Sequence, residues 1–332
     1  MKSRRNFVKS GLAASLGISL LPHLVSCKSE PLFRFAVCSD IHKDIMPDAD
    51  KRLATFIKVA SSYNANFIVQ LGDFCYPTSD NKQFMSIWNS FAGNRYSVLG
   101  MHDLNRNTKL EITDFLNMPD SRYSFDVNGI TFIILDTNFY KDSNGNFYDY
   151  SARNFMGKEN LNQVPDIQTE WLRAKLEQTN NKCIIFSHYP LYNTQNPEIN
   201  ANVRTVLNSE NSRAGYKKVI ASFNGYTHAD YSQTVNGITY VSINSMSNIW
   251  VGAKYSSTRR FTQLDNKNYP PLKYTIPYTL PLYAIVEIFK DRIRLIGTNS
   301  AFMKPTPLDM DMHSREDGFP LRPIISDLEI SI

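Results

Sequence analysis

The 332-residue sequence predicts an α/β fold with parallel strands. Residues 32–38 form an apolar run typical of a strand, 48–64 show the periodicity of an amphipathic helix, and 67–71 form a second apolar run. A strand, a helix and a strand of these lengths make a βαβ unit, whose two strands are parallel neighbours. Gly72 ends the second strand because glycine tolerates positive φ, and it places Asp73 at the lip of the sheet. Taken alone, this Gly-Asp pair is more typical of an ordinary turn than of a functional site.

Further elements follow in order along the chain. Helical patterns cover three stretches: 81–91, 109–117 and 166–178. Short strands are predicted at 96–99, 183–186, 219–223 and 238–243. Two hairpins are predicted, one at 123–127 and 130–136 around Asn128-Gly129, the other at 283–289 and 293–296. Residues 138–163 are rich in Asn, Tyr, Asp and Gly and predict a long loop near the mouth of a site.

The first 27 residues have the features of an export signal. Arg4-Arg5 precedes an apolar stretch, 11–25, that is too short for a spanning helix, which is typical of a twin-arginine signal peptide. The stretch ends in Leu24-Val25-Ser26-Cys27, which resembles the lipobox of bacterial lipoproteins. Lipidated Cys27 would hold the protein at a membrane surface in the bacterial cell envelope. A plain signal peptide and an uncleaved anchor are the alternatives.

The charge of the chain resides largely in this signal. Removing residues 1–26 takes away four basic residues and no acidic ones, so the formal charge falls from +5 to +1. A nearly neutral protein gives no support for a nucleic-acid partner. The other three cysteines, Cys38, Cys75 and Cys183, have no disulfide or zinc-finger spacing and are interpreted as structural. The expected domains are 28–300 and a C-terminal extension, 301–332.

Acidic and imidazole side chains follow five of the predicted strands. They are Asp40 and His42, then Asp73, then His102 and Asp103, then His188, and finally His228. A single histidine is more often a surface or core residue, but this repetition favours a site at the carboxyl edge of the sheet. Imidazole and carboxylate together suit zinc, iron, manganese or nickel and not an all-oxygen calcium site. A carboxylate such as Asp73 can bridge two ions, and an ion pair can clamp a phosphate group.

In this order the motifs resemble the calcineurin-like metallophosphoesterases. The family pattern is D-x-H, G-D, G-N-H-[DE], a lone H and G-H-x-H. The corresponding segments are Asp40-Ile41-His42, Gly72-Asp73, Gly100-Met101-His102-Asp103, His188 and Gly225-Tyr226-Thr227-His228. The resemblance covers about residues 32–245. It implies a four-layer α/β/β/α metallophosphoesterase sandwich of two mixed sheets.

The resemblance also implies roles for these residues. Asp40, His42, Asp73 and His228 would hold the first metal, with Asp73 bridging to a second ion held by His188. His102, oriented by Asp103, would protonate the leaving alkoxide or stabilise charge on the phosphoryl oxygens. The expected cofactor is manganese, iron or zinc.

Two positions depart from the family pattern, and both belong to the second ion. Met101 replaces an asparagine, and Tyr226 replaces the first histidine of G-H-x-H. A thioether is a poor ligand for a hard divalent ion, and a phenol ligates only as the phenolate. The sequence therefore predicts one firmly bound ion and a weak or empty second site.

Tyr76 is a candidate extra ligand. The segment Gly72-Asp73-Phe74-Cys75-Tyr76 fits the G-D-x-x-Y spacing of purple acid phosphatases, where the tyrosine binds ferric iron. Those enzymes lack the histidine two residues after the first aspartate, however, and this chain has His42. Packing and substrate contact are the alternative roles for Tyr76.

Two functions are consistent with these residues. The first is a metal-dependent phosphoesterase that hydrolyses phosphate mono- or diesters at the cell envelope. The second is an inactive lipoprotein of the same fold that acts as a surface binding or scaffold protein. The chain has neither the G-x-S-x-G motif of serine hydrolases nor a P-loop. Residues 246–332 add Trp250, Tyr255 and Arg259-Arg260, which either reach the substrate or belong to a covering loop.

Overall fold

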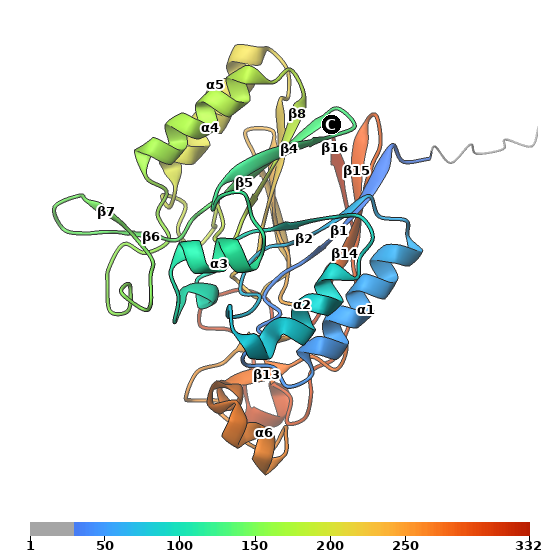
Figure 1. Ribbon diagram of the computed structural model, residues 1–332, viewed down its shortest axis with the longest axis vertical. Coiled ribbons are helices and arrows are strands. Elements are labelled where there is room, and N and C mark those ends of the chain that lie inside the picture. The colour runs from blue at the N-terminus through green and yellow to red at the C-terminus, as the bar shows by residue number, and fades with distance from the viewer. Residues whose placement is uncertain (1–29) are drawn as a thin grey trace, which may run out of the picture. The chain divides into compact units, whose positions relative to one another are not determined.

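Two six-stranded mixed sheets form the centre of the protein, seen here in a computed structural model that describes residues 30–332 (Figure 1). The first sheet has the order β16-β15-β14-β1-β2-β3, and the second has the order β10-β11-β9-β8-β5-β4. In the first sheet, β1 pairs in parallel with β2 and β2 with β3, while β14 runs antiparallel to β1. In the second, β5, β8, β9 and β11 are parallel, and β4 and β10 are antiparallel edge strands. Both sheets are therefore mixed.

The strands of each sheet have the following bounds. The first sheet contains β1 (Phe33–Cys38), β2 (Phe67–Gln70), β3 (Asn94–Ser97), β14 (Ala284–Ile288), β15 (Arg292–Ile296) and β16 (Leu328–Ser331). The second contains β4 (Tyr123–Val127), β5 (Ile130–Leu135), β8 (Lys182–Ser187), β9 (Val219–Asn224), β10 (Tyr231–Val235) and β11 (Ile238–Ser242). Two small two-stranded antiparallel sheets are β6 (Phe139–Lys141) with β7 (Phe147–Asp149), and β12 (Asn248–Trp250) with β13 (Thr275–Pro277).

The two sheets pack face to face through aromatic residues. Phe35 on β1 stacks on Phe67 of β2 with ring centroids 4.8 Å apart. Phe35 also meets Phe132 of β5 and Phe186 of β8 edge-on, at 5.6 and 5.8 Å. Successive strand residues point to opposite faces, so alternate residues remain for the outer faces of the sheets. The inner layer of the core is therefore shared by both sheets.

Helices cover the two outer faces (Figure 1). The helices are α1 (Ala49–Ser62), α2 (Lys82–Asn89), α3 (Lys109–Phe115), α4 (Asp166–Gln178), α5 (Ala201–Ala214) and α6 (Gln263–Asn268). Leu53 and Phe56 of α1 share a buried cluster with Ala36 and Ile68 of the first sheet. On the second sheet, a separate cluster joins α4 and α5 to the outer residues of β5 and β8. This arrangement confirms the predicted four-layer α/β/β/α sandwich.

Most predicted elements are present, and several additional ones occur. The hairpin around Asn128-Gly129 is confirmed as β4 and β5, because both turn residues have the positive φ that a tight hairpin turn requires. Helix α5 and strands β10 and β16 were not among the predicted elements. The predicted loop 138–163 contains the β6–β7 pair. The buried residues of α5, Val203, Val206, Leu207 and Glu210, have helical spacing, but one of them is charged, so the apolar stripe that would indicate the helix is only three residues long.

Residues 301–332 return to the first sheet. They supply β16, and Met312, Ile325 and Ile330 lie in the core between the sheets. Among residues 30–332, no helix is long and apolar enough to cross a membrane. The twin-arginine signal and the lipobox at Cys27 lie outside the described residues.

Candidate metal centre

The loops after four strands, β1, β2, β8 and β9, meet at one edge of the sandwich. Asp40 and His42 follow β1, Asp73 follows β2, His188 follows β8, and His228 follows β9. Hydrogen bonds tie these loops together: Asp40 N donates to Gly72 O at 3.0 Å, His42 N to Asp73 O at 2.9 Å, and Gly225 N to His188 O at 3.1 Å. The carboxyl ends of parallel strands thus deliver the side chains to a common point.

The backbone of this edge is strained. Five non-glycine residues adopt left-handed φ angles between 46° and 67°: Asp40, His42, Asp73, Tyr226 and His228. Such angles cost free energy for residues other than glycine, and they concentrate where a functional geometry requires them. The strain lies at four of the five predicted metal ligands.

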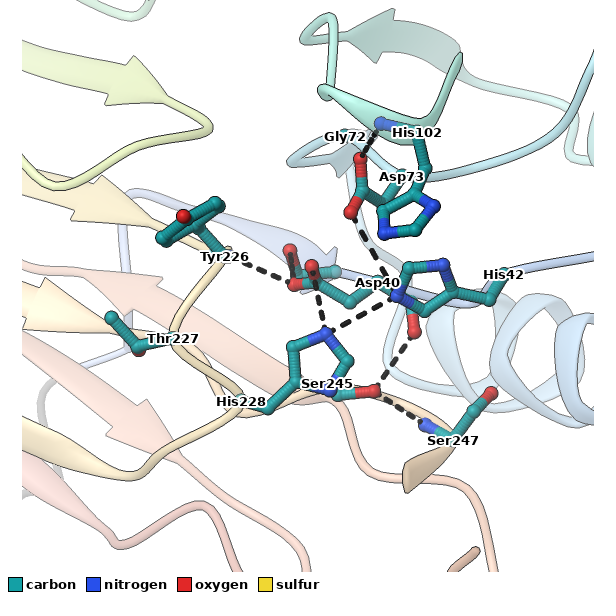
Figure 2. A network of polar contacts seen from close by, with 12 residues as sticks. Asp40, His42, Gly72, Asp73, His102, Tyr226, Thr227, His228, Ser245 and Ser247 are labelled. Atoms are coloured by element: carbon teal, nitrogen blue, oxygen red, sulfur yellow. Dashed lines mark hydrogen bonds and ion pairs between the residues drawn. The ribbon is translucent and has the colours of Figure 1, made fainter. Parts of the chain in front are cut away.

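Imidazole and carboxylate groups converge at short distances (Figure 2). His42 Nε2 lies 3.2 Å from His228 Nε2, and His228 Nε2 lies 3.3 Å from Asp40 Oδ1. The two oxygens of Asp73 face different histidines, Oδ2 lying 3.8 Å from His42 Nε2 and Oδ1 lying 3.3 Å from His188 Nε2. All five residues are at least 97% buried. The position of Asp73 between two groups of ligands is that of a bridging carboxylate.

Backbone carbonyls orient two of the histidines. His228 Nδ1 lies 2.7 Å from Asn248 O, and His188 Nδ1 lies 2.7 Å from Leu71 O. Because a carbonyl only accepts, each Nδ1 carries a proton and donates it. Nε2 is then the atom that each ring presents to the carboxylates, as in metal sites where a second hydrogen bond fixes the ring.

The donor set fits a cation. Asp40 Oδ1 and His188 Nε2 are buried with no hydrogen-bond partner among the described residues. A buried carboxylate oxygen without a partner is costly; a first ion would satisfy Asp40 Oδ1, and a second ion would satisfy His188 Nε2. Three overlapping groups have potential ligand atoms within 4.8 Å of one another: Asp40, His42 and His228; His42, Asp73 and His102; and Asp40, Asp73 and His188. Mixed nitrogen and oxygen donors suit a divalent transition metal.

The ionisation of the metal-free centre also indicates a place for positive charge. Burial raises the pKa of Asp73, but His188, His102 and His42 outweigh it and hold the pKa below its usual range. Burial lowers the pKa of His188, yet the negative charge of Asp73, whose Oδ1 lies 3.3 Å from His188 Nε2, raises it to about 10. Burial lowers the pKa of His42 to about 3, which keeps this ring neutral and able to ligate. In the metal-free protein, the proton on His188 therefore supplies the positive charge beside Asp73 that a metal ion would otherwise supply.

An open cleft of about 560 Å³ lies above the centre. It is lined by Asp73, Met101, His102, Asn193, Gln195, Tyr226, Thr227, His228, Trp250, Arg315, Asp317 and Phe319. Its volume is in the range of small-molecule sites. The centre is thus buried on the protein side and accessible from the cleft.

Comparison with known proteins identifies the family. The model of the calcineurin-like phosphoesterases matches residues 33–240, which include all five strand-end motifs. This chain belongs to the calcineurin-like phosphoesterase family. The family and the ligand groups together support a metal-dependent phosphoesterase that binds divalent metal.

Solved structures share the fold. A dimetal phosphatase from Danio rerio is 14% identical with a TM-score of 0.61, and the match covers 91% of this chain and 99% of the other. GAP50, the anchor in the inner membrane complex of Plasmodium, is 13% identical with a TM-score of 0.50, covering 90% and 89%. No curated protein sequence matches this chain at a significant level. The two structures thus show that one fold serves a phosphatase and an anchor.

At the second metal position of this phosphoesterase, the Tyr226 ring is turned away from Asp40, His42 and His228 (Figure 2). The backbone N of Tyr226 donates to Asp40 Oδ2 at 3.1 Å, but its ring lies edge-on to His188 at 5.6 Å. Burial raises the pKa of Tyr226, so the side chain remains a phenol. Met101 lines the cleft with a neutral thioether. Asp73 and His188 are then the predicted ligands left for a second ion.

Tyr76 lies beside the centre in a small pocket that it shares with His42, Asp73 and His102. Arg106 stacks over the Tyr76 ring at 5.0 Å. Burial raises the pKa of Tyr76, which disfavours the phenolate that metal ligation requires. These contacts are those of a packed aromatic residue.

His102 is held by neighbours that its motif does not contain. Its Nδ1 lies 3.1 Å from the Asn105 amide nitrogen, and its ring stacks parallel to Trp250 with centroids 5.5 Å apart. With the amide donating, the ring carries its proton on Nε2. Burial lowers the pKa of His102, so the imidazole is neutral near pH 7 in the metal-free protein.

Asp103 acts on the backbone and does not contact the imidazole. Its carboxylate accepts hydrogen bonds from Phe74 N at 2.7 Å and Gly100 N at 2.8 Å. These bonds join the turn after β2 to the turn that carries His102. Burial and the nearby Asp73 raise the pKa of Asp103 to about 8, while the two backbone N–H groups oppose them.

Arg315 is a further site residue, and it comes from the last 32 residues of the chain. It donates from Nη1 to His228 O at 2.6 Å and from Nη2 to Thr227 O at 2.7 Å. Nε also donates to Asp317 Oδ1 at 2.8 Å. Arg315 thus clamps the strained turn that presents His228. No spacing relative to the motifs could have indicated this residue or Asn105.

The other late aromatic and basic candidates divide between several places. Trp250 lines the cleft, which is the position expected of a residue that reaches the substrate. Tyr255 and Arg259 line a separate surface groove. Arg260 is buried and donates to Pro305 O and Thr275 O, so it supports the fold.

Proposed function

We propose that this phosphoesterase hydrolyses phosphate mono- or diesters with one firmly bound manganese, iron or zinc ion, and that its activity is weak. The observation that carries the proposal is the convergence of three imidazole rings and two carboxylates, nearly fully buried, beneath an open cleft. Two of their atoms, Asp40 Oδ1 and His188 Nε2, make no hydrogen bond among the described residues. Such a donor set is costly without a cation, so metal binding is part of the stable state.

The residues have distinct roles in this proposal. Asp40, His42, Asp73 and His228 hold the first metal, and His188 offers one ligand beside Asp73 for a second. When bound, the metal supplies Lewis-acid polarisation of a phosphoryl oxygen. His102 presents an Nε2 proton toward the reacting phosphate, where the neutral ring donates a hydrogen bond to developing negative charge; protonation of the leaving oxygen would require the imidazolium form. Asn105, Trp250 and Asp103 keep this ring and its turn in place.

The location proposed for the enzyme is the bacterial cell envelope. The support comes from the sequence: Arg4-Arg5, the apolar stretch after them, and Cys27 at the end of a lipobox-like tetrapeptide. Twin-arginine export carries folded proteins, which suits a chain that binds its metal before export. Cys27 would then be lipidated and hold the protein at the membrane.

A surface binding or scaffold role is the second candidate, and the Tyr226 and Met101 positions favour it. Both expected ligands of the second ion are replaced, and beside His188 there is a neutral phenol ring, lying edge-on at 5.6 Å, in place of an imidazole ligand. A phosphoesterase with one ion would lack a second positive charge on the phosphate. The open cleft favours chemistry over a filled, inert site.

Metal content and turnover of a generic phosphodiester, measured together, test these functions. We expect one metal per chain and slow turnover in the unmodified protein. The Met101→Asn, Tyr226→His variant should bind two metals and turn over faster, because it restores both family ligands. A matched control is Met156→Asn, Tyr148→His, since both of these residues are exposed.

Two results would change the proposal. Two metals with rapid turnover in the unmodified protein would show that another ligand completes the second site. Activity confined to the restored variant would mean that the native chain has lost the chemistry and that binding is its role.

A further inference from the structure

We propose that the cleft above the metal centre binds a phosphodiester with an aromatic substituent and discriminates against dianionic phosphate monoesters. This inference rests on the proposed phosphoesterase function and names its substrate class. It follows from the side chains that form the walls of the cleft and from the charges available at its floor.

The walls of the cleft present apolar and aromatic groups from separate loops. Met101, Tyr226 and Trp250 line it and are each partly exposed. Trp250 lies within 6° of parallel to the His102 ring, so the indole stands next to the group that faces the reacting phosphate. An organic group attached to a phosphate on the floor would therefore contact an aromatic surface. Aromatic rings gain from offset or edge-to-face contact with such a surface.

The aromatic residues of these walls pack against neighbouring aromatic side chains. Tyr226 packs against Tyr189 with ring centroids 4.4 Å apart, and Phe319 stacks on Tyr231 at 4.8 Å. Trp250 also meets His42 edge-on at 5.6 Å. Side chains already fixed by their neighbours lose little entropy when a ligand binds. The aromatic surface is therefore preorganised for a planar substituent.

The charge of the cleft favours a monoanion. Among the residues that line it, Arg315 is the single lysine or arginine. Four of its five N–H donors are taken by Thr227 O, His228 O and the Asp317 carboxylate, and that carboxylate also neutralises its charge. One metal ion then faces the substrate phosphate without help from a free basic side chain. A phosphodiester carries one negative charge and a monoester up to two, so the diester is the better electrostatic match.

The remaining rim is polar but uncharged. Asn193 and Gln195 line the cleft, and Gln195 lies against the loop at Gly318. Amide groups can bond to polar atoms of a substituent without requiring charge. A neutral aromatic substituent thus meets a complementary wall and rim, whereas a polyphosphate would meet neither.

Ligand binding provides a test that does not depend on turnover. Diphenyl phosphate and dimethyl phosphate carry the same charge and differ in aromatic surface. We expect the metal-loaded full chain to bind diphenyl phosphate at least tenfold more tightly, measured by titration calorimetry. In the Trp250→Leu variant this ratio should fall toward one, and in Trp250→Phe it should be largely retained. Trp171→Leu is the matched control, because Trp171 lies on α4 and packs in the outer cluster of the second sheet.

Turnover tests the same preference on the reaction. Phenyl p-nitrophenyl phosphate, methyl p-nitrophenyl phosphate and p-nitrophenyl phosphate share one leaving group and are compared by kcat/KM relative to their uncatalysed rates. We expect the phenyl diester to exceed the methyl diester about tenfold, mainly through KM, and both to exceed the monoester. Because Trp250 contacts His102, kcat for the methyl diester reports any indirect effect of its variants.

The possible results test the preference for aromatic diesters and the phosphoesterase function separately. Equal binding of the two diesters, or a preference for the monoester, would overturn the aromatic-diester inference even if turnover is observed. Tight binding of diphenyl phosphate with no turnover by the metal-loaded protein would overturn the phosphoesterase proposal and leave the cleft as a ligand site. Tighter diphenyl phosphate binding with faster phenyl diester turnover would support both.

Discussion

Gly100 is where a single methyl group should most directly disturb the metal centre. A Cβ at this position would lie 2.0 Å from Asp73 N and 2.2 Å from Asp73 Oδ1. The backbone has no positive φ here, so the effect of Gly100→Ala is steric and does not come from backbone strain. The same Asp73 oxygen accepts a hydrogen bond from His102 N at 2.8 Å. The added methyl must therefore move either the carboxylate proposed to bridge the ions or the turn that carries His102.

The expected size follows from the overlap. Overpacking a filled site costs about 1–3 kcal/mol when neighbours must shift. If Asp73 moves, that free energy is lost from metal binding, and affinity falls about 5- to 140-fold. If the turn moves instead, the cost appears in the free energy of unfolding of the metal-free protein. Metal affinity is measured by chelator competition and unfolding by urea titration of the metal-free protein.

Gly145→Ala is the control, because a Cβ there meets nothing closer than 3.7 Å and only its positive φ opposes the change. We expect it to lower stability by up to about 1 kcal/mol and to leave metal affinity unchanged. Unchanged metal affinity and unchanged stability in Gly100→Ala would refute the steric reasoning. Equal loss of metal affinity in both variants would refute the assignment of the effect to Asp73.

Three further outcomes can be measured on the same protein. Arg315→Gln should lower metal affinity by about tenfold in the chelator assay, because two carbonyls of the His228 turn lose charged donors; an unchanged affinity would mean that the turn holds without the clamp. His188 has a pKa of about 10 in the metal-free fold, above its unfolded value near 6.5, so its stabilisation is complete below about pH 6.5 and is lost as pH rises through 10. Urea unfolding at pH 6 and 9.5 should show this loss in the native chain and much less of it in His188→Gln, and parallel pH profiles would contradict it. Thr108→Ala should cost about 1 kcal/mol by breaking the capping box of α3 with Glu111, without changing metal content; a loss of metal would show that α3 supports the centre.

The sequence predicted the inner architecture because burial on both faces leaves a strong pattern. Strands β1, β2, β8 and β9 are nearly continuous apolar runs, and each ends directly at a polar motif. Helix α5 and strand β10 lack that pattern. The middle of β10 is exposed and polar, and it pairs at the edge of its sheet. Whether such an edge segment forms a strand depends on its contacts with neighbouring strands, and these contacts cannot be recognised from the local sequence.

The candidate site was predictable to the extent that its residues follow strands. Asp40, His42, Asp73, His188 and His228 are brought together because parallel strands end at one edge. Arg315 and Asn105 act through backbone carbonyls and a ring nitrogen, contacts that depend on how separate loops meet. Asp103 shows the same limit, since its role in joining two turns is visible only when Phe74 N and Gly100 N are placed.

The two departures from the family pattern connect metal content with substrate preference. Tyr226 and Met101 occupy positions where the family pattern has ligands, and both line the cleft. Replacing a metal ligand with an aromatic or thioether group removes positive charge from the phosphate and adds apolar surface beside it. Both changes favour an aromatic diester. Its single negative charge needs less compensating positive charge, and its aromatic substituent gains contact with the added apolar surface. The proposed weak second site and the proposed preference for aromatic diesters would then both follow from the same substitutions, so the Met101→Asn, Tyr226→His variant should alter both together.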